Sequence, residues 1–485
     1  MTQLGSNTQL GSNVQVGIDP NFNPLWFSGC VAWFDMQDPA SYVQAGTVSS
    51  ITNKASGVGW TSAGASQPMY AAAGFNGLPC MSFDGVANKI ISTEAAVVAA
   101  MANNNAVTVF SVVKSDDPDT TNGFFGVGNS GVVSNQTKKY GTTTGGTGQW
   151  ALMTVDNAGT SVNLLSTAST ADANNHVVEI FTSTSAGTIL VDGAAVGATG
   201  VAYAPSTLTP DRCAIGCRPD SSPDQLWDGQ IAEILVFNRE LTAFERAVVR
   251  TYLLRKWGIA DPTPLTILGA NCTQWQRADQ GVTLATGVSQ WNDLAGGGHH
   301  LTQATGGAQP AWGSTAGPNG TPAITFDGVD DALYSPTPTR AAPGTTPTWI
   351  WIVLKQITWS NAERIFSAGN SSSQITLAQI GGSPGLASYN GVTSNTNNGL
   401  AVGAWGAVQT YFNNTTADYI QVNDLTPTTG INTGNNGLQV GMWVGSGLST
   451  LYSNIAVADF VTANVLPTTE QLAWISAYRF LRYLF

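Results

Sequence analysis

The sequence predicts an all-β chain of two tandem β-sandwiches, each closed by a helix at its C-terminal end. Three observations predict it: a short pattern that occurs twice, many brief strand-like segments between glycine-rich turns, and one helical pattern at the end of each half. The pattern Asn-Gly-x-Pro-x-x-x-Phe-Asp-Gly-Val occupies residues 76–86 and again residues 319–329. Each copy is typical of a turn, a strand and a second turn, because Asn-Gly and Asp-Gly tolerate positive φ. A repeat of domain length indicates two copies of one domain.

The domain boundaries follow from the spacing of the two copies. We expect four segments: an extended arm over residues 1–23, a first sandwich over 24–260, a proline linker over 261–264 and a second sandwich over 265–485. Residues 107–114 and 349–355 are long and apolar, which predicts strands buried on both faces. Residues 231–237 predict another core strand. Short strands, glycine-rich turns and a terminal helix together favour a jelly-roll sandwich in each half.

The arm carries a perfect hexapeptide repeat, Thr-Gln-Leu-Gly-Ser-Asn, twice over residues 2–13. It has too little apolar mass to fold alone, so two interpretations stay open: a frayed tail, or a segment that adds to the sheet edge of another subunit. The repeated leucine slightly favours docking. The residues expected to dock are Leu4, Leu10, Val14, Val16 and Ile18.

The two halves end in matching helical patterns. Thr242 and Glu245 have the spacing of a capping box, and Thr468 and Gln471 have the same spacing in the second half. Apolar residues follow at helical spacing in both. We expect each helix to lie across its own sandwich.

The composition excludes several classes of function. Charged residues make up 10% of the 485 residues, the net charge is −12, and no basic cluster points to nucleic acid. An acidic surface repels anionic lipids, and no apolar run reaches membrane length, so we expect no membrane insertion. No segment resembles a signal peptide, which favours synthesis and folding in a cytoplasm. The five cysteines are an odd number for a disulfide framework, and we expect reduced, structural thiols.

A series of short motifs runs in a fixed order along the first half: Trp33-Phe34-Asp35, Asn76-Gly77-x-Pro79, Phe83-Asp84-Gly85, Val191-Asp192-Gly193, and the stretch 228–258. In this order they resemble the laminin-G-like, concanavalin A-like jelly-roll superfamily. The likeness covers nearly all of residues 24–485, although the second half has Arg277 near the position of Asp35. The resemblance implies sugar-binding modules, glycosidases, adhesion modules or virion surface proteins of tailed phages. The charge-poor tandem arrangement is most similar to the last group.

Motifs for catalysis are missing from the sequence. Glycosidases need two carboxylates at a fixed separation, and members of this superfamily that cleave β-glucans carry Glu-x-Asp-x-(x)-Glu on one strand. None of the seven glutamates has an aspartate two positions later, and we expect Glu233 to face outward or to bond locally. His176, His299 and His300 have no accompanying nucleophile motif. We therefore expect no enzyme.

Calcium is the metal that the turns would suit best. Asp327, Asp330 and Asp331 cluster, but the EF-hand spacing is absent and the first copy has Ala87 and Asn88 at the latter two positions. We expect turn capping by Asp84 and Asp327, with calcium binding as the alternative and no other cofactor.

Four tryptophans lie in polar or loop contexts and are candidates for exposed platforms on which sugar rings stack: Trp60, Trp150, Trp312 and Trp359. Others lie in apolar strand patterns and are expected in the core: Trp33, Trp275, Trp349 and Trp351.

These features lead us to expect a non-enzymatic structural protein of a phage virion, a capsid or tail decoration protein docked through its arm. The expected partners are other virion proteins, namely a major capsid or tail protein, and sister copies in a homo-oligomer, with weaker contact to host surface glycans. The protein would be made in the host cytoplasm and reside on the virion surface. The alternative is a carbohydrate-binding adhesin or a receptor-binding fibre component.

Overall fold

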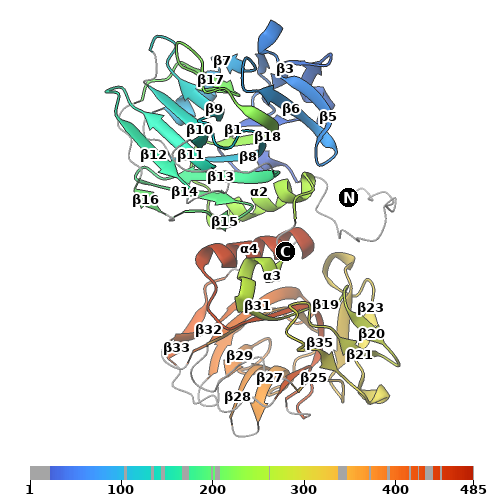
Figure 1. The fold of residues 1–485 in the computed structure, drawn as a ribbon. Coiled ribbons are helices and arrows are strands. Elements are labelled where there is room, and N and C mark those ends of the chain that lie inside the picture. The colour runs from blue at the N-terminus through green and yellow to red at the C-terminus, as the bar shows by residue number, and fades with distance from the viewer. Residues whose placement is uncertain are drawn as a thin grey trace. The chain divides into compact units, whose positions relative to one another are not determined.

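The computed structural model describes residues 22–483 except for 103–105, 133–135, 144–147, 167–173, 198–199, 203–207, 261–262, 337–346, 371–372, 390–393, 414–416, 424, 432–440 and 448–449. Leu4, Leu10, Val14, Val16 and Ile18 of the predicted docking arm lie outside the described residues. The chain divides into two compact units between Asp261 and Pro262 (Figure 1). We refer to the part before this division as the first unit and to the part after it as the second unit.

The first unit consists of two antiparallel sheets. The helix-side sheet has the order β15 (Ala194–Ala195), β14 (Ala186–Val191), β13 (His176–Thr182), β8 (Val107–Ser115), β18 (Asp228–Phe237), β6 (Leu78–Asp84) and β5 (Met69–Phe75), with β1 (Cys30–Asp35) beside β18 and β16 (Val201–Ala202) beside β14. The opposite sheet has the order β12 (Ser161–Leu165), β11 (Gln149–Val155), β10 (Thr137–Thr143), β9 (Gly123–Gly128), β17 (Arg212–Ile215), β7 (Ile90–Ser92), β4 (Gly59–Thr61), β3 (Val48–Thr52) and β2 (Tyr42–Gln44).

The second unit repeats this order. Its helix-side sheet runs β23 (Ala311–Gly313), β24 (Ala323–Asp327), β35 (Asn454–Ala463), β26 (Thr348–Gln356), β31 (Trp405–Phe412), β32 (Ala417–Val422) and β33 (Thr428–Ile431), with β19 (Cys272–Arg277) beside β35. Its opposite sheet runs β20 (Val282–Leu284), β21 (Val288–Trp291), β22 (Leu301–Thr302), β25 (Leu333–Ser335), β34 (Met442–Val444), β27 (Arg364–Asn370), β28 (Ser373–Gln379), β29 (Leu386–Tyr389) and β30 (Ser394–Asn397).

One long strand organises each helix-side sheet. In the first unit, β18 pairs with β6 through its first residues and with β1 through its last, and a register shift near Ala232 separates the two pairings. In the second unit, β35 pairs with β24 and then with β19 in the same way. This shared arrangement brings the repeated motif and the tryptophan opening of each half to the same long strand. The predicted duplication of an all-β sandwich is confirmed.

Each sandwich has a helix on one outer face. Four α-helices occur in the described part of the chain: α1 (Ala95–Met101), α2 (Ala243–Lys256), α3 (Pro264–Leu268) and α4 (Thr469–Tyr483). The capping boxes predicted for α2 and α4 are present, because Thr242 exchanges hydrogen bonds with Glu245 and Thr468 with Gln471. Six short 3₁₀ segments complete the structure: Pro24–Trp26, Pro39–Ser41, Gly64–Ser66, Gly269–Asn271, Gly306–Ala308 and Pro318–Gly320.

The layers are clearest in the second unit. One core cluster lies between its sheets and contains Phe326 and Phe460 from the helix-side sheet and Phe366 from the opposite sheet. A second cluster lies on the other face of the helix-side sheet, where Trp351 packs with Tyr478 of α4. The helix-side sheet is therefore buried on both faces, as the sequence predicts for β8 and β26.

Two short helices depart from the sequence prediction. Helix α1 lacks a side-chain cap, so no local signal marks its start. Pro264, assigned to the linker, is instead the first residue of α3, where proline fits because its missing N–H needs no partner. None of the helices in the described residues combines the length and the hydropathy that a membrane span requires.

Candidate functional site

Glu233 anchors the end of α2 to the helix-side sheet of the first unit. Its carboxylate accepts hydrogen bonds from the indole N–H of Trp33 at 2.7 Å and of Trp257 at 2.6 Å, and Lys256 Nζ lies 2.7 Å from Oε2. The expectation that Glu233 faces outward or bonds locally is wrong, because α2 covers the face to which it points and leaves it 1% exposed. Burial raises the pKa of Glu233 above its ordinary value. The carboxylate is committed to holding the helix.

The same helix end is tied to the repeated motif. Asn76, in the turn between β5 and β6, has a φ of 50°, a left-handed conformation that asparagine tolerates better than most residues. Its Nδ2 donates to the carbonyl of Trp257 at 2.8 Å and to that of Gly258 at 3.3 Å. The turn and the residues after α2 are thereby fixed to each other.

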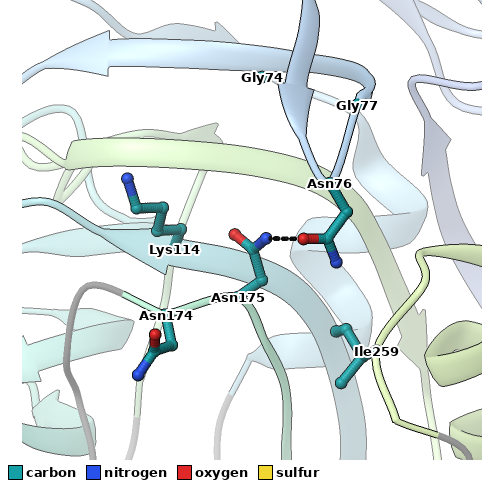
Figure 2. A pocket seen from close by; sticks show the side chains of 7 residues that line it. All are labelled: Gly74, Asn76, Gly77, Lys114, Asn174, Asn175 and Ile259. Atoms are coloured by element: carbon teal, nitrogen blue, oxygen red, sulfur yellow. Dashed lines mark hydrogen bonds between the residues drawn. The ribbon is translucent and has the colours of Figure 1, made fainter.

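A hollow of about 480 Å³ opens beside this junction (Figure 2). Seven residues line it: Gly74, Asn76, Gly77, Lys114, Asn174, Asn175 and Ile259. They come from the end of β5 with the β5–β6 turn, the end of β8, the segment before β13 and the segment after α2. We call this site the amide pocket, because three of the seven side chains are carboxamides.

Hydrogen bonding inside the amide pocket is incomplete. Asn175 Nδ2 donates to Asn76 Oδ1 at 2.6 Å, which orients both side chains (Figure 2). The Asn175 carbonyl oxygen is buried, and no donor to it occurs among the described residues. Lys114 is paired with Asp116 at 2.8 Å, so the cation beside the pocket is locally balanced. The pocket therefore offers donors and acceptors to an uncharged polar ligand.

None of the described residues that line the amide pocket carries a carboxylate, an imidazole or a thiol. The nearest such group along the chain is His176, next to Asn175. Its Nδ1 lies 2.7 Å from Asp192 Oδ2, and Asp192 also accepts the backbone N–H of Val177. The histidine and aspartate hold the start of β13 against the turn after β14.

Two of the predicted sugar platforms are buried. Trp60 and Trp150 are both 0% exposed, so the prediction that they form a surface platform is wrong. Trp60 points inward from β4, donates its indole N–H to Glu94 at 2.7 Å and packs against Phe34 with ring centroids 4.6 Å apart. Trp150 stacks on Trp227, with centroids 6.4 Å apart. Polar neighbours in the sequence concealed this burial, because alternate residues of a short strand face opposite sides.

The other two tryptophans keep some exposure. Trp312 is 37% exposed and donates its indole N–H to the carbonyl of Ala278. Trp359 is half-buried and donates to the carbonyl of Gly385. Both lie in the second unit, and their role as platforms for sugar rings stays a prediction. Trp33, Trp275, Trp349 and Trp351 lie in the core, as predicted.

The acidic turn after β24 is hydrogen-bonded to its own backbone. The carboxylate oxygens of Asp327, Asp330 and Asp331 lie within 4.8 Å of one another. Asp327 Oδ1 accepts the N–H of Val329 at 2.8 Å, and Asp331 Oδ2 accepts the N–H of Asp327 at 2.9 Å. Burial, with help from the two neighbouring carboxylates, raises the pKa of Asp331 to about 6. The predicted turn capping is confirmed, and calcium binding stays an untested alternative.

The cysteines lie mostly in the interior. Cys80, Cys213, Cys217 and Cys272 are buried, and Cys30 is half-buried. Burial raises the pKa of each thiol to about 12, which keeps it protonated and unreactive near neutral pH. The burial and the raised thiol pKa values agree with the structural role predicted for the cysteines.

A family model places this geometry among known folds. Residues 88–245 match the concanavalin A-like lectin/glucanases superfamily. The matched stretch lies in the first unit and includes Lys114, Asn174 and Asn175 of the amide pocket. With the two antiparallel sheets and the terminal helix of each unit, it confirms the predicted concanavalin A-like jelly-roll fold. No curated protein matches the sequence.

Several solved structures show a distant likeness. A GH54 α-L-arabinofuranosidase soaked with a cyclic sulfate inhibitor is 14% identical, with 44% of this chain and 65% of that chain covered and a TM-score of 0.34. The CBM40 of Ruminococcus gnavus IT-sialidase bound to α2,3-sialyllactose is 12% identical, with 34% and 90% covered and a TM-score of 0.28. Domains LG4-5 of the mouse laminin α1 chain are 11% identical, with 77% and 89% covered and a TM-score of 0.23. The chain spans 65% of the length of the arabinofuranosidase.

Proposed function

We propose that this protein binds carbohydrate without cleaving it, and that the amide pocket of the first unit is the binding site. The observation that carries the proposal is the pair Asn76 and Asn175, joined at 2.6 Å and leaving a buried carbonyl oxygen without a donor in the described part of the chain. A sugar hydroxyl is both donor and acceptor, so it can satisfy that oxygen and accept from a neighbouring amide. The match of residues 88–245 to a lectin/glucanase family supports the ligand class.

The size and stiffness of the pocket suit a small saccharide. Its 480 Å³ falls in the range of about 300–1,000 Å³ that small-ligand sites occupy. Asn76 is held by two backbone carbonyls and Asn175 by Asn76, so little side-chain entropy is lost on binding.

The lining residues also support binding without hydrolysis. Glycoside hydrolysis needs a carboxylic acid and a carboxylate on either side of the scissile bond. The described residues of the lining include neither. Glu233 is held by Lys256 and two indoles, and Glu179 is paired with Arg246 and Arg250.

A second candidate function places the protein on a phage particle. The hexapeptide repeat of residues 2–13 precedes two sandwiches and favours an arm that docks onto a major capsid or tail protein, or onto a sister copy. In this form of the proposal, the protein is a decoration protein of the virion surface, and the amide pocket contacts host glycans.

Calorimetric titration of the full chain with a panel of neutral mono- and disaccharides tests the proposed site. In the second unit, Trp405 on β31 pairs with Lys355 on β26, and Lys355 Nζ lies 5.4 Å from the centroid of the Trp405 ring. Asn175 and Lys114 occupy the corresponding positions in the first unit. The variant Asn175→Trp should therefore fill the pocket with a side chain that the fold accepts at this position. We expect at least a tenfold loss of affinity.

The matched control is Asn163→Trp, which adds the same indole at an exposed position of β12. We expect it to bind saccharide like the wild type. Equal binding by Asn175→Trp would remove the amide pocket as the site. Release of reducing ends from a polysaccharide by the purified chain would overturn the non-enzymatic part of the proposal.

A further inference from the structure

A row of side chains crosses the opposite sheet of the second unit, with one residue on each of five neighbouring strands. In the order of pairing, the row consists of Tyr334, Trp443, Ser367, Thr376 and Tyr389. The strand neighbours of these residues, such as Leu333, Val444, Phe366 and Leu377, belong to the core between the sheets. Because successive side chains of a strand point to opposite faces, the row lies on the outer face. We call it the transverse row.

Aromatic rings occupy both ends of the transverse row. Tyr334 and Trp443 contact each other with ring centroids 4.5 Å apart and planes 32° apart, and both are half-buried. Tyr389, at the other end, is also half-buried. Partly exposed aromatic rings suit the apolar C–H faces of a sugar ring.

The guanidinium group of Arg364 lies beside the row. Arg364 Nη1 is 3.4 Å from Thr376 Oγ1. No carboxylate among the described residues forms an ion pair with Arg364, and its buried Nε has no acceptor there. Burial lowers the pKa of Arg364, so the charged side chain would gain free energy from an anion that reaches it. A carboxylate fits a guanidinium with two parallel hydrogen bonds.

The first unit provides an internal comparison. Its strands pair in the same order, and the corresponding residues are Ile91, Ala214, Gly126, Lys139 and Met153. Gly123 corresponds to Arg364, because each forms an isolated parallel β-bridge. Gly123 bridges to Leu226, and Arg364 bridges to Tyr452. The three aromatic residues have no aromatic counterpart, whereas a cation is retained, because the Lys139 side chain packs over Gly123 and donates to Gln225 at 2.8 Å. The same fold therefore forms without the aromatic residues, which indicates that they serve something other than folding.

We infer that the transverse row is a second glycan-binding face, for sugars that carry a carboxylate, with a ring packed on Tyr334 and Trp443 and the carboxylate on Arg364. Two strand spacings separate Trp443 from Thr376, about 10 Å, which is of the order of two linked sugar rings. Ser367 and Thr376 are both fully buried, and Ser367 donates to the carbonyl of Ser446, so the ligand would pass over these two residues without contacting their hydroxyl groups. This inference rests on the proposed carbohydrate-binding function but uses a different site.

The test uses two probes and the full chain. One probe is a disaccharide that ends in glucuronic acid, and the other is the matched disaccharide that ends in glucose. We expect Arg364→Gln to weaken binding of the acidic probe at least tenfold and to leave the neutral probe unchanged. Trp443→Ala, which installs the residue found at Ala214, should weaken binding of the acidic probe similarly. Leu284→Ala removes an exposed apolar side chain of the same unit and serves as the control, with no expected effect.

The outcomes separate this site from the amide pocket. If Asn175→Trp leaves the acidic probe bound while Arg364→Gln and Trp443→Ala release it, the transverse row is the site. If Asn175→Trp alone releases it, carbohydrate binding stands and the transverse row is not the site. No binding of the acidic probe by the wild-type chain would also overturn the inference. Tyr334→Ile installs the residue that the first unit has at Ile91. It replaces Trp443→Ala in the test if that variant has a lowered melting temperature.

Discussion

Trp33 donates its indole N–H to Glu233, a residue 200 positions later in the chain, at 2.7 Å. The second unit repeats this bond, since Trp275 donates to Asp459 at 3.1 Å. In each case the carboxylate lies on the long central strand and is also bound by the helix, through Trp257 and Lys256 in one unit and Tyr478 and Tyr483 in the other. The duplicated fold thus retains one buried acid that joins the first strand, the central strand and the helix.

An exchange of charged residues beside this bond explains why the second unit has Arg277 where the first unit has Asp35. In the first unit, Asp35 pairs with Lys256 at 2.7 Å. The second unit has arginines at both corresponding positions, Arg277 and Arg482, which would repel each other. Asp279 lies between them and pairs with both, at 2.8 and 2.6 Å. One further acidic residue restores the balance, so the exchange leaves the helix anchored.

Removal of the buried acid should destabilise the chain strongly. Glu233→Ala leaves two indole N–H groups and part of the Lys256 charge without a partner, and we expect a loss of about 3 kcal/mol in the free energy of unfolding. Urea denaturation followed by tryptophan fluorescence measures it. Glu240→Ala, at an exposed position, is the control and should change stability by less than about 0.5 kcal/mol. Equal effects of the two substitutions would contradict the anchoring role.

Asp331 should make stability depend on pH. Its folded pKa of about 6 exceeds the ordinary value of 3.8, so the folded state binds a proton more readily and this group favours folding increasingly as the pH falls from 7 toward 4. Asp331→Asn installs the residue of the first unit, where Asn88 accepts the N–H of Asp84 at 3.1 Å. We expect this variant to melt higher than the wild type at pH 7 and no higher at pH 4. A constant difference across this range would refute the assignment.

The same variant tests the calcium alternative. If the acidic turn only caps its own backbone, added calcium should leave the melting temperature of the wild type and of Asp331→Asn equally unchanged. A calcium-dependent rise in the wild type that disappears in Asp331→Asn would instead show a cation site at Asp327, Asp330 and Asp331.

Substitution of Trp60 should destabilise the chain much more than substitution of Trp312. Trp60→Ala empties a fully buried site, and a loss of about 3–5 kcal/mol is expected for such a cavity. Trp312→Ala removes a partly exposed ring and one hydrogen bond, and should cost about 1 kcal/mol. Chemical denaturation of both variants gives the comparison, and a small loss for Trp60→Ala would contradict its place in the core.

Deletion of residues 1–18 tests the virion proposal. The arm has few apolar residues, so the melting temperature of the truncated chain should match that of the full chain. If the arm docks onto a particle, incorporation into that particle should disappear, as measured by the amount of the chain in purified particles. Normal incorporation with lost attachment to glycans would favour the adhesin alternative.

Features encoded by neighbouring residues were predictable from the sequence. The repeated motif, the two capping boxes and the apolar strands 107–114 and 349–355 depend on contacts within a few residues or on simple alternation. Helix α1 was not predictable in this way, because its first turn has no capping side chain.

Features that depend on distant partners were not predictable. Trp60 is buried because Phe34 and Phe125 from other strands enclose it. The amide pocket combines four segments between residues 74 and 259, and of its side chains only Asn76 stood out in a motif. The burial of Glu233 depends on α2, which begins ten residues later and folds back across the strand.

A crystal structure of the full chain with the neutral saccharide that binds it most tightly tests the central claim most directly. The account predicts intact saccharide in the first unit, with hydroxyl groups within hydrogen-bond distance of Asn76 and Asn175. Saccharide bound elsewhere with this pocket empty, or saccharide cleaved in the crystal, would contradict it.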